Sequence, residues 1–321
     1  MTKPFGSIGN QPPRGQKSMS FGDLSCVLHM PRATQSRFGA RGEEETQRLA
    51  PFSPVEVFSV DDFPNCPPEW LRSNRSLGVM TYFVPAIAGH MVWFDLRANE
   101  QHSHHVAAII SAQGINALTG ARMPGAVLDQ RLEQYQTACP IHQTPFTGRK
   151  KFCHACGFEW QDQNYLASTT VRPGQFWRDG FCRPDGLTRE FVFTERTSEG
   201  VAANLIGDDR INAFGIALFT SRQPKPRPVY RAPFAKSLGL ESMNVERGAL
   251  SFGSMEVAAG AIVNQTLGRD ENRLDSWSNT PAAAFLVYYV DQAQFAKITG
   301  YDGERGRASS GDGFMAGTVG K

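Results

Sequence analysis

The chain has 321 residues, of which 40% are apolar, and a formal net charge of +2. This apolar fraction supports a buried core and excludes a wholly disordered protein, while the near-neutral charge argues against a general nucleic-acid binder. The N-terminal residues hold no apolar segment typical of a secretion signal, and no run of about 18 apolar residues follows. We therefore expect a soluble, cytoplasmic globular protein without membrane contact, alone or within a larger assembly.

Residues 1–52 are rich in Gly, Pro, Ser, Gln and Arg, and their one apolar patch is 24–30. A segment of this composition cannot bury a core by itself, so we expect a disordered tail. The alternative is an extended arm that orders against a neighbouring subunit, with 26–28 as its anchoring strand. Residues 301–321 are rich in Gly, Ser, Arg and Asp and predict a second flexible tail.

Two segments, 53–123 and 164–221, contain short apolar runs separated by Gly and Pro, a pattern typical of β-strands. Strands of the first block are expected at 55–60, 79–84, 91–96 and 106–110. The triplet Trp93-Phe94-Asp95 has a weak counterpart, Trp177-Arg178-Asp179, in the second block. This likeness suggests two similar β units packed face to face. We predict a mainly β fold in which β-sandwich-like blocks flank an inserted module.

The inserted region, 124–163, begins with a helical pattern. Leu128, Leu132 and Tyr135 follow at i, i+4 and i+7, with charged residues between them. This spacing predicts a helix of two to three turns within 124–138. The helix leads into the one stretch whose residue spacing indicates a definite chemistry.

That stretch, 137–161, contains two pairs of metal-ligand residues, Cys139 with His142 and Cys153 with Cys156, the latter followed by Gly157. Two residues between the members of a pair permit a tight turn that points both side chains to one side, and glycine suits its left-handed position. Four N and S ligands select tetrahedral Zn²⁺ over Mg²⁺ or Ca²⁺, which prefer oxygen. With all four positions filled by protein, we expect the zinc to be structural.

The stretch resembles a two-knuckle zinc ribbon, with CPIH as the first knuckle and CHACG as the second. The resemblance covers about 25 residues and implies a structural Zn²⁺ that stabilises the fold. His142 stands where a cysteine is more common, so His154 and Cys182 are the alternative ligands. The few remaining cysteines argue against a disulfide framework and favour a reducing compartment.

Beyond 221 we expect a linker and then a small α+β unit. Residues 222–235 alternate Pro with basic residues, which is typical of an extended spacer. In the unit 236–300, the run 285–290 is the most strand-like of the chain. Asp291 predicts the N-cap of a helix that turns Phe295 and Ile298 inward. The run 256–263 mixes Ala with Val and Gly, so it indicates neither a helix nor a strand clearly.

We favour a non-enzymatic, zinc-stapled β scaffold that acts in protein–protein interaction or self-assembly, with a protein partner or copies of itself. The sequence contains no phosphate-binding loop, nucleophile elbow or dinucleotide motif. One alternative is a nucleic-acid-binding protein in which the ribbon uses Arg149, Lys150, Lys151 and Trp160.

A further alternative is a hydrolase that uses Asp95 and Asp179 as a carboxylate pair. Such a pair needs both carboxyl groups in one cleft, about 5–9 Å apart. An aspartate at a strand end more often caps a turn. His102, His104 and His105 also invite a metal site, but in a strand the third points away from the first two, so we expect a strand edge or loop.

The zinc prediction is tested by Cys153→Ser. Loss of one thiolate removes a ligand, so the variant should release zinc and unfold at a lower temperature, because zinc binding and folding are coupled. Metal content by mass spectrometry and the melting temperature are the measurements. A Cys153→Ser protein that keeps its zinc and its melting temperature excludes a zinc staple at this position.

Overall fold

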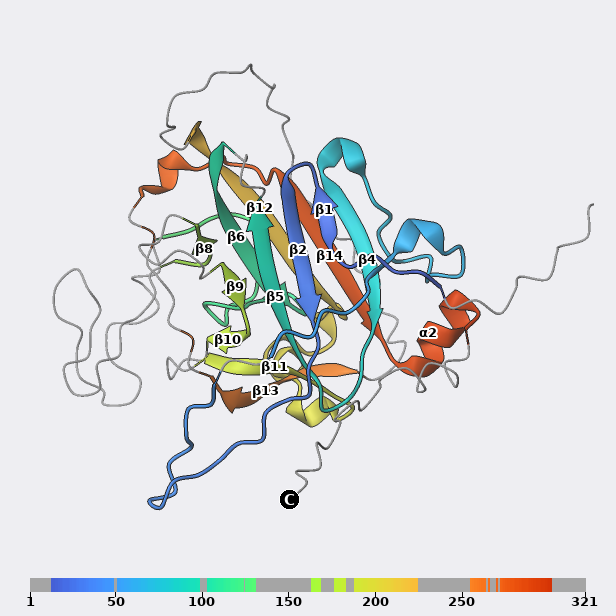
Figure 1. The fold of residues 1–321 in the computed structure, drawn as a ribbon, viewed down its shortest axis with the longest axis vertical. Helices are drawn as coiled ribbons and strands as arrows, with labels where there is room; N and C mark the ends of the chain where they lie inside the picture. Colours follow the sequence, from blue (N-terminus) through green and yellow to red (C-terminus); the bar gives the residue numbers. More distant parts are fainter. Residues whose placement is uncertain are drawn as a thin grey trace, which may run out of the picture.

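The computed structural model describes residues 13–48, 51–98, 103–123, 125–130, 163–168, 176–182, 188–224, 255–263, 265, 270 and 272–301. Within these residues the chain forms two β-sheets of seven strands each, which pack face to face (Figure 1). The prediction of a mainly β fold is confirmed. None of the helices in this part of the chain is long and apolar enough to cross a membrane.

The first sheet has the order β1-β2-β5-β11-β10, with β9 beside β5 and β13 beside β11. All its pairings are antiparallel. Its strands are β1 (Met19–Phe21), β2 (Leu24–His29), β5 (Met91–Ala98), β9 (Trp177–Arg178), β10 (Gly180–Cys182), β11 (Thr188–Thr194) and β13 (Glu256–Ile262).

The second sheet has the order β3-β4-β14-β12-β6-β7, with β8 beside β6. Only the β4–β14 pairing is parallel among its described strands. Its strands are β3 (Phe58–Ser59), β4 (Val79–Pro85), β6 (His104–Ala112), β7 (Ile115–Asn116), β8 (Leu166–Ala167), β12 (Ala213–Pro224) and β14 (Ala283–Val290).

The helices in the described residues are short and lie at the ends and on one face of the sandwich (Figure 1). The α-helices are α1 (Val201–Ile206) and α2 (Gln292–Thr299). The 3-10 turns are η1 (Val60–Asp62), η2 (Arg75–Leu77), η4 (Thr197–Glu199), η5 (Gly207–Asp209) and η6 (Leu274–Ser276).

Phe214 of β12 lies in the core between the sheets. Its ring centroid is 5.1 Å from that of Phe94 and 5.6 Å from that of Phe191, both in the first sheet, and 5.5 Å from that of Tyr289 in its own sheet. Edge-to-face and tilted aromatic pairs of this kind stabilise by about 0.5–1.5 kcal/mol each beyond the burial of their area. The two sheets are therefore joined by one aromatic cluster.

The second sheet also buries its other face. There α2 packs Phe295 and Ile298 against Phe58 and Phe83, while Trp277 covers part of β6 and β12. Strands buried on both faces have continuous apolar runs, which explains the runs at 79–84 and 285–290. The Asp291 side chain accepts a hydrogen bond from Gln294 N at 2.7 Å. The predicted N-cap and inward residues of this helix are thus confirmed.

The expectation of a disordered tail over 1–52 is wrong for residues 13–48. Leu24, Cys26 and Leu28 point into the core from β2, which pairs with β5 of the same chain. The alternative of an anchoring strand over 26–28 was right about the strand, but not about a neighbouring subunit. β2 needs no core formed by its own segment, because it adds to β5 and buries its apolar face in the core that the two sheets share.

The predicted helix within 124–138 is absent from its described part, 125–130. Leu128 is buried beside Tyr165 and Trp277 in an extended segment, and the Asp129 N–H donates to Asn164 Oδ1 at 2.8 Å. These tertiary contacts outweigh a helical spacing that is only a local preference. Residues 131–138 lie outside the described part.

The two expected β blocks do not form separate units. β5 from 53–123 pairs with β11 from 164–221, and β6 pairs with β12 in the same way. β14, expected in the small unit 236–300, lies between β4 and β12. The region 55–60 forms only the short β3 and the turn η1, and 256–263 is mostly the strand β13. Similar triplets in the sequence therefore did not indicate a structural repeat.

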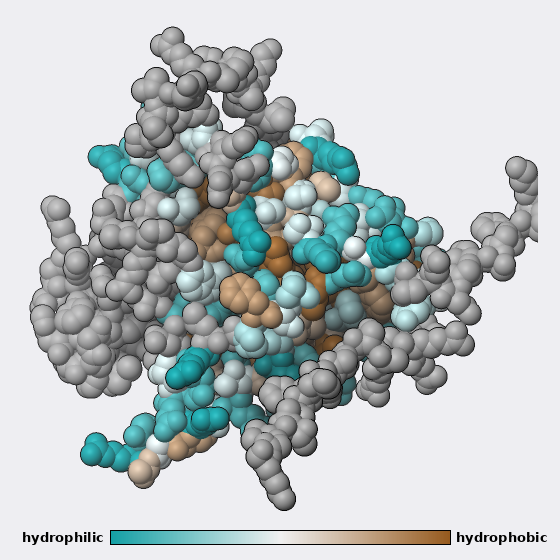
Figure 2. Space-filling view, viewed as in Figure 1, coloured by the Kyte–Doolittle hydropathy of each residue, from teal (hydrophilic) through white to brown (hydrophobic). Residues whose placement is uncertain are grey.

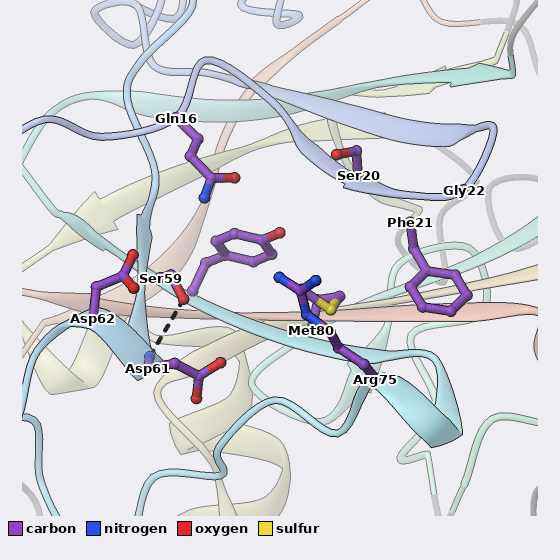
Figure 3. Close-up of a pocket in the computed structure, with 10 residues that line it drawn as sticks. Gln16, Ser20, Phe21, Gly22, Ser59, Asp61, Asp62, Arg75 and Met80 are labelled. Carbon is purple, nitrogen blue, oxygen red and sulfur yellow. Dashed lines mark hydrogen bonds between the residues drawn. The ribbon is translucent and has the colours of Figure 1, made fainter.

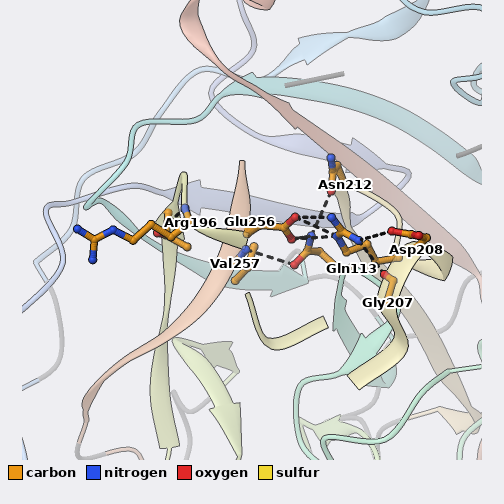
Figure 4. A network of polar contacts seen from close by, with 9 residues as sticks. Gln113, Arg196, Gly207, Asp208, Asn212, Glu256 and Val257 are labelled. Atoms are coloured by element: carbon orange, nitrogen blue, oxygen red, sulfur yellow. Dashed lines mark hydrogen bonds and ion pairs between the residues drawn. The ribbon is translucent and has the colours of Figure 1, made fainter. Parts of the chain in front are cut away.

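A buried polar network joins the two sheets at the start of β13 (Figure 4). Glu256 is 1% exposed, and it accepts hydrogen bonds from the Arg210 guanidinium at 2.7 Å and from Gln113 Nε2 at 2.8 Å. Gln113 also donates to Asn212 Oδ1 and accepts from the Val257 backbone N–H. Gln113 has a φ of 53°, a left-handed conformation that a residue other than glycine adopts only where its surroundings hold it.

Replacing Glu256 by Ala should lower the free energy of unfolding by roughly 2–3 kcal/mol. Breaking a buried ion pair costs about 3–5 kcal/mol, and we expect the lower figure because the Arg210 side chain is 16% exposed. Urea denaturation measures the change. Arg196→Gln is the control, since its pair with Glu199 is 78% and 43% exposed and should contribute less than about 1 kcal/mol. Equal losses in the two variants would contradict a structural role of the network.

Candidate functional site

All residues expected to bind zinc or nucleic acid lie outside the described part of the chain: Cys139, His142, Arg149, Lys150, Lys151, Cys153, His154, Cys156 and Trp160. The zinc ribbon and its nucleic-acid surface therefore remain predictions. Cys182, the other alternative ligand, is buried in β10.

The two ends of the ribbon segment lie against each other. Asn164 donates its backbone N–H to Asp129 O at 3.1 Å and its side-chain amide to Val127 O at 2.9 Å. Gln130 Nε2 donates to the Tyr165 hydroxyl at 2.6 Å. The chain thus leaves the sandwich and returns to it at one place, as it does for an inserted module.

The buried carboxylate of Asp270 holds the point where the ribbon segment returns to the sandwich. Asp270 is buried, and its Oδ2 accepts hydrogen bonds from the Tyr165 hydroxyl and from Trp277 Nε1, both at 2.7 Å. Its backbone N–H donates to Gln163 Oε1 at 2.7 Å. Burial, with the hydrogen bond to Asp270, raises the pKa of Tyr165, so the hydroxyl keeps its proton and remains a donor. The base of the ribbon segment is therefore fixed to the sandwich.

Asp95 and Asp179 lie near each other in the first sheet but in different surroundings. Asp95 of β5 stands opposite Trp177 of β9 and accepts a hydrogen bond from Arg97 Nε at 2.8 Å. Asp179, between β9 and β10, is 2% exposed. One carboxylate is ion-paired and the other is buried, so the two do not form an open pair for a substrate.

Asp179 shares its surroundings with Glu190, a residue that sequence reasoning missed. Glu190 is fully buried on β11, where it pairs with Gly180. Burial raises the pKa of Asp179 to about 7; the Arg178 charge lowers this pKa and the Glu190 charge raises it. Burial also raises the pKa of Glu190. Asp179 Oδ2 and Glu190 Oε1 accept no hydrogen bond from the described residues. Because a buried carboxylate without donors is costly, this favours the protonated form of these two carboxyl groups.

Residues 31–48 cross the first sheet over Glu190. The Thr34 backbone N–H donates to Glu190 Oε2 at 3.1 Å, and the Gln47 N–H donates to Ile262 O at 2.7 Å. Arg189 and Glu44 form an ion pair at 2.6 Å in which both side chains are mostly buried. This segment is therefore bound to the sheet at several points and also covers Glu190.

The middle of this segment, residues 36–45, which we call the arm, projects from the sandwich as a hairpin (Figures 1 and 2). Phe38 forms a β-bridge with Glu44, and the Glu45 N–H donates to Arg37 O at 2.8 Å. Gly42, with a φ of 79°, supplies the left-handed residue of the turn. The Phe38 side chain is 65% exposed. The arm thus presents an aromatic side chain to solvent on an ordered backbone.

A hollow of about 450 Å³ opens between β1 and β4, at the edge of the sandwich (Figure 3). Its apolar lining includes Met80 and Phe21, and its charged lining consists of Asp61, Asp62 and Arg75. The two aspartates lie together at one end, Phe21 lies at the other, and Arg75 extends between them (Figure 3). The exposed lining of the hollow is therefore mainly polar and carries charges of both signs.

The sequence contains only weak signals for the buried Glu190 and for the arm. Arg189 and Glu190 interrupt an apolar strand, which places one charge on each face of a buried sheet. Gly39-Ala40-Arg41-Gly42 is a turn signal inside a segment whose composition otherwise indicates disorder.

The described residues contain no group of three or more His, Cys, Asp or Glu side chains that could hold a metal ion. His104 and His105 begin β6, in agreement with a strand-end position, and His104 Nδ1 lies 2.7 Å from Ser221 O. His102 lies outside the described residues.

Scans against protein-family models, curated proteins and solved structures each found no match. The fold and its surface define a two-sheet β-sandwich with a projecting hairpin and an open hollow at its edge.

The buried acidic pair predicts how stability changes with pH. Below about pH 4, Asp179 is protonated in both the folded and the unfolded state. Between about pH 4 and 7 the unfolded state releases this proton while the folded state keeps it, because the folded pKa is about 7. The free energy of unfolding should therefore fall as pH rises across this window and change little above it.

Asp179→Asn removes this titration, so its free energy of unfolding relative to the wild type should rise by roughly 2 kcal/mol from pH 5 to pH 8. Denaturant titrations at several pH values provide the measurement. Asp275→Asn, at an exposed position, should give a difference that does not depend on pH. Parallel curves for Asp179→Asn and the wild type would show that Asp179 is ionised in the fold throughout.

Proposed function

We propose that this protein is a non-enzymatic β scaffold that assembles with copies of itself through the arm. The observation behind the proposal is the exposed Phe38 on an ordered, projecting hairpin. Burying a phenylalanine side chain stabilises by about 1.5–3 kcal/mol, a gain that the isolated chain forgoes. Aromatic side chains in such positions are frequent anchors of protein interfaces.

The arm is already ordered in the isolated chain, and this favours binding. A segment that must fold on binding loses conformational entropy at that step, whereas a preformed hairpin loses less. Backbone hydrogen bonds hold the hairpin, and the Arg189–Glu44 ion pair fixes its base to β11. The arm therefore offers Phe38 in one geometry.

We also propose that the ribbon segment is an inserted module with a structural zinc ion. Support comes from the spacing of its cysteines and histidine and from the hydrogen bonds between 125–130 and 163–168, which close the base of the insertion. The hydrolase alternative has less support, because Asp95 is ion-paired and Asp179 is buried. The nucleic-acid alternative depends on residues outside the described part of the chain.

Phe38→Ser should weaken self-association about tenfold or more, since a loss of 1.4 kcal/mol corresponds to a factor of ten. Sedimentation velocity over a range of protein concentrations measures the dissociation constant. Leu205→Ser is the matched control, because Leu205 is an exposed apolar residue on α1, outside the arm. A wild-type protein that is monomeric at all concentrations, or a Phe38→Ser variant that assembles normally, refutes the proposal.

A further inference from the structure

We propose that the arms of two copies of the chain pair edge to edge around a two-fold axis, with Phe38 of one copy opposite Phe38 of the other. Strand pairing, an aromatic contact and two ion pairs then hold the two arms together. This inference rests on the proposed self-assembly and adds the surface that receives Phe38.

The outer edge of the arm has free backbone hydrogen-bonding groups. Within the hairpin, the Gly39 N–H donates to Glu43 O at 2.8 Å. The Glu45 N–H donates to Arg37 O, also at 2.8 Å. These bonds flank Phe38, so the Phe38 N–H and C=O point away from the other strand, and neither bonds to the described residues. Because the arm projects from the sandwich (Figure 1), this edge is open to a second strand, which binds through main-chain hydrogen bonds.

The side chains along this edge select one register. With the axis at Phe38, the two phenylalanines lie opposite each other and Arg37 lies opposite Gly39 of the second copy. Moving one strand by two residues in one direction places Arg37 opposite Arg37, and like charges directly opposite each other destabilise a strand pair. Moving it in the other direction places Phe38 opposite Ala40, within the turn that the Gly42 N–H closes on Gly39 O. The register centred at Phe38 therefore pairs the two rings and keeps the two copies of Arg37 apart.

Gly39 leaves room for an ion pair between the two copies. Side chains alternate between the faces of a strand, so Arg37 and Gly39 share the face of the hairpin that holds Glu43. The Glu43 carboxylate lies over Gly39, where an added Cβ would be only 2.7 Å from Glu43 Oε1. Arg37 of the second copy faces the same glycine and thus reaches this carboxylate, and the two-fold axis repeats the ion pair. Both Arg37 and Glu43 are exposed, and neither forms an ion pair with other described residues.

The exposed charges of the arm suit a second copy of the same surface. Arg37 and Arg41 are positive and Glu43 and Glu45 are negative, so these four exposed side chains have no net charge. A contact around a two-fold axis joins the same surface of both chains, which must therefore be complementary to itself. A balanced set of charges meets this condition. The contact closes after two chains, because the arm of each is then occupied.

The test mixes two variants with opposite charge changes. In a dimer of Arg37→Glu chains two carboxylates meet at each contact, and in a dimer of Glu43→Arg chains two positive charges meet. Each variant should therefore self-associate at least about threefold more weakly than the wild type. A mixed dimer contains one chain of each kind and pairs opposite charges at both contacts.

An equimolar mixture of these two variants, the charge-reversed mixture, should contain far more mixed dimers than random pairing gives. Their dissociation constant should lie within about threefold of the wild-type value. Native mass spectrometry with one chain isotopically labelled counts the mixed and unmixed dimers.

Glu45→Arg is the matched control. It makes the same charge change on the same face of the hairpin, but Glu45 lies opposite Arg37 of its own chain, outside the proposed ion pair. In a mixture of Arg37→Glu with Glu45→Arg, a mixed dimer keeps one like-charge contact with Glu43. This mixture should therefore contain no more mixed dimers than random pairing gives.

The outcomes separate this inference from the proposed function. If Phe38→Ser weakens assembly but the charge-reversed mixture shows no excess of mixed dimers, the arm binds elsewhere; the inference then fails while the proposed function stands. Assemblies of more than two chains that depend on Phe38 have the same meaning. If Phe38→Ser has no effect, both fail. An excess of mixed dimers in the charge-reversed mixture but not in the control mixture supports both.

Discussion

Burial of the second sheet on both faces is the constraint on which the rest of the structure depends. One face meets the first sheet around Phe214, and the other is covered by α2 and by the segments near Trp277. Its central strands therefore consist of continuous apolar runs, and β14, from the end of the chain, must pair with β4 and β12 for the sheet to form. Strands far apart in the sequence have to come together before either face is covered.

The arm belongs to a loop that leaves the first sheet at the end of β2. Residues 31–48 lie over β11 of the same sheet, where Thr34 binds Glu190 and Glu44 binds Arg189. The chain then returns to the end of β2, where His29 and Pro54 form a β-bridge. The arm is therefore the projecting part of a loop whose two ends meet beside β2, and Glu190 lies under the same loop.

The sequence allowed prediction of features that depend on local pattern. The predicted strands at 79–84 and 285–290 and the predicted Asp291 cap are confirmed, because continuous apolar runs and helix caps are local signals. The helix at 124–138 and the disordered N-terminal tail were wrong in their described parts, because Leu128 and the β2 residues obtain their stability from distant strands. Three features could not be predicted: the pairing of strands from different blocks, the burial of Glu190, and the hollow. Each depends on contacts between residues far apart in the sequence, and composition and periodicity carry no information about such contacts.

The central claim is that the chain assembles as a zinc-containing scaffold, and native mass spectrometry of the wild-type protein tests it most directly, because one spectrum reports both bound metal and subunit number. The account predicts one zinc ion per chain and an assembled fraction that grows with protein concentration. A metal-free monomer at every concentration would contradict both the zinc module and the assembly.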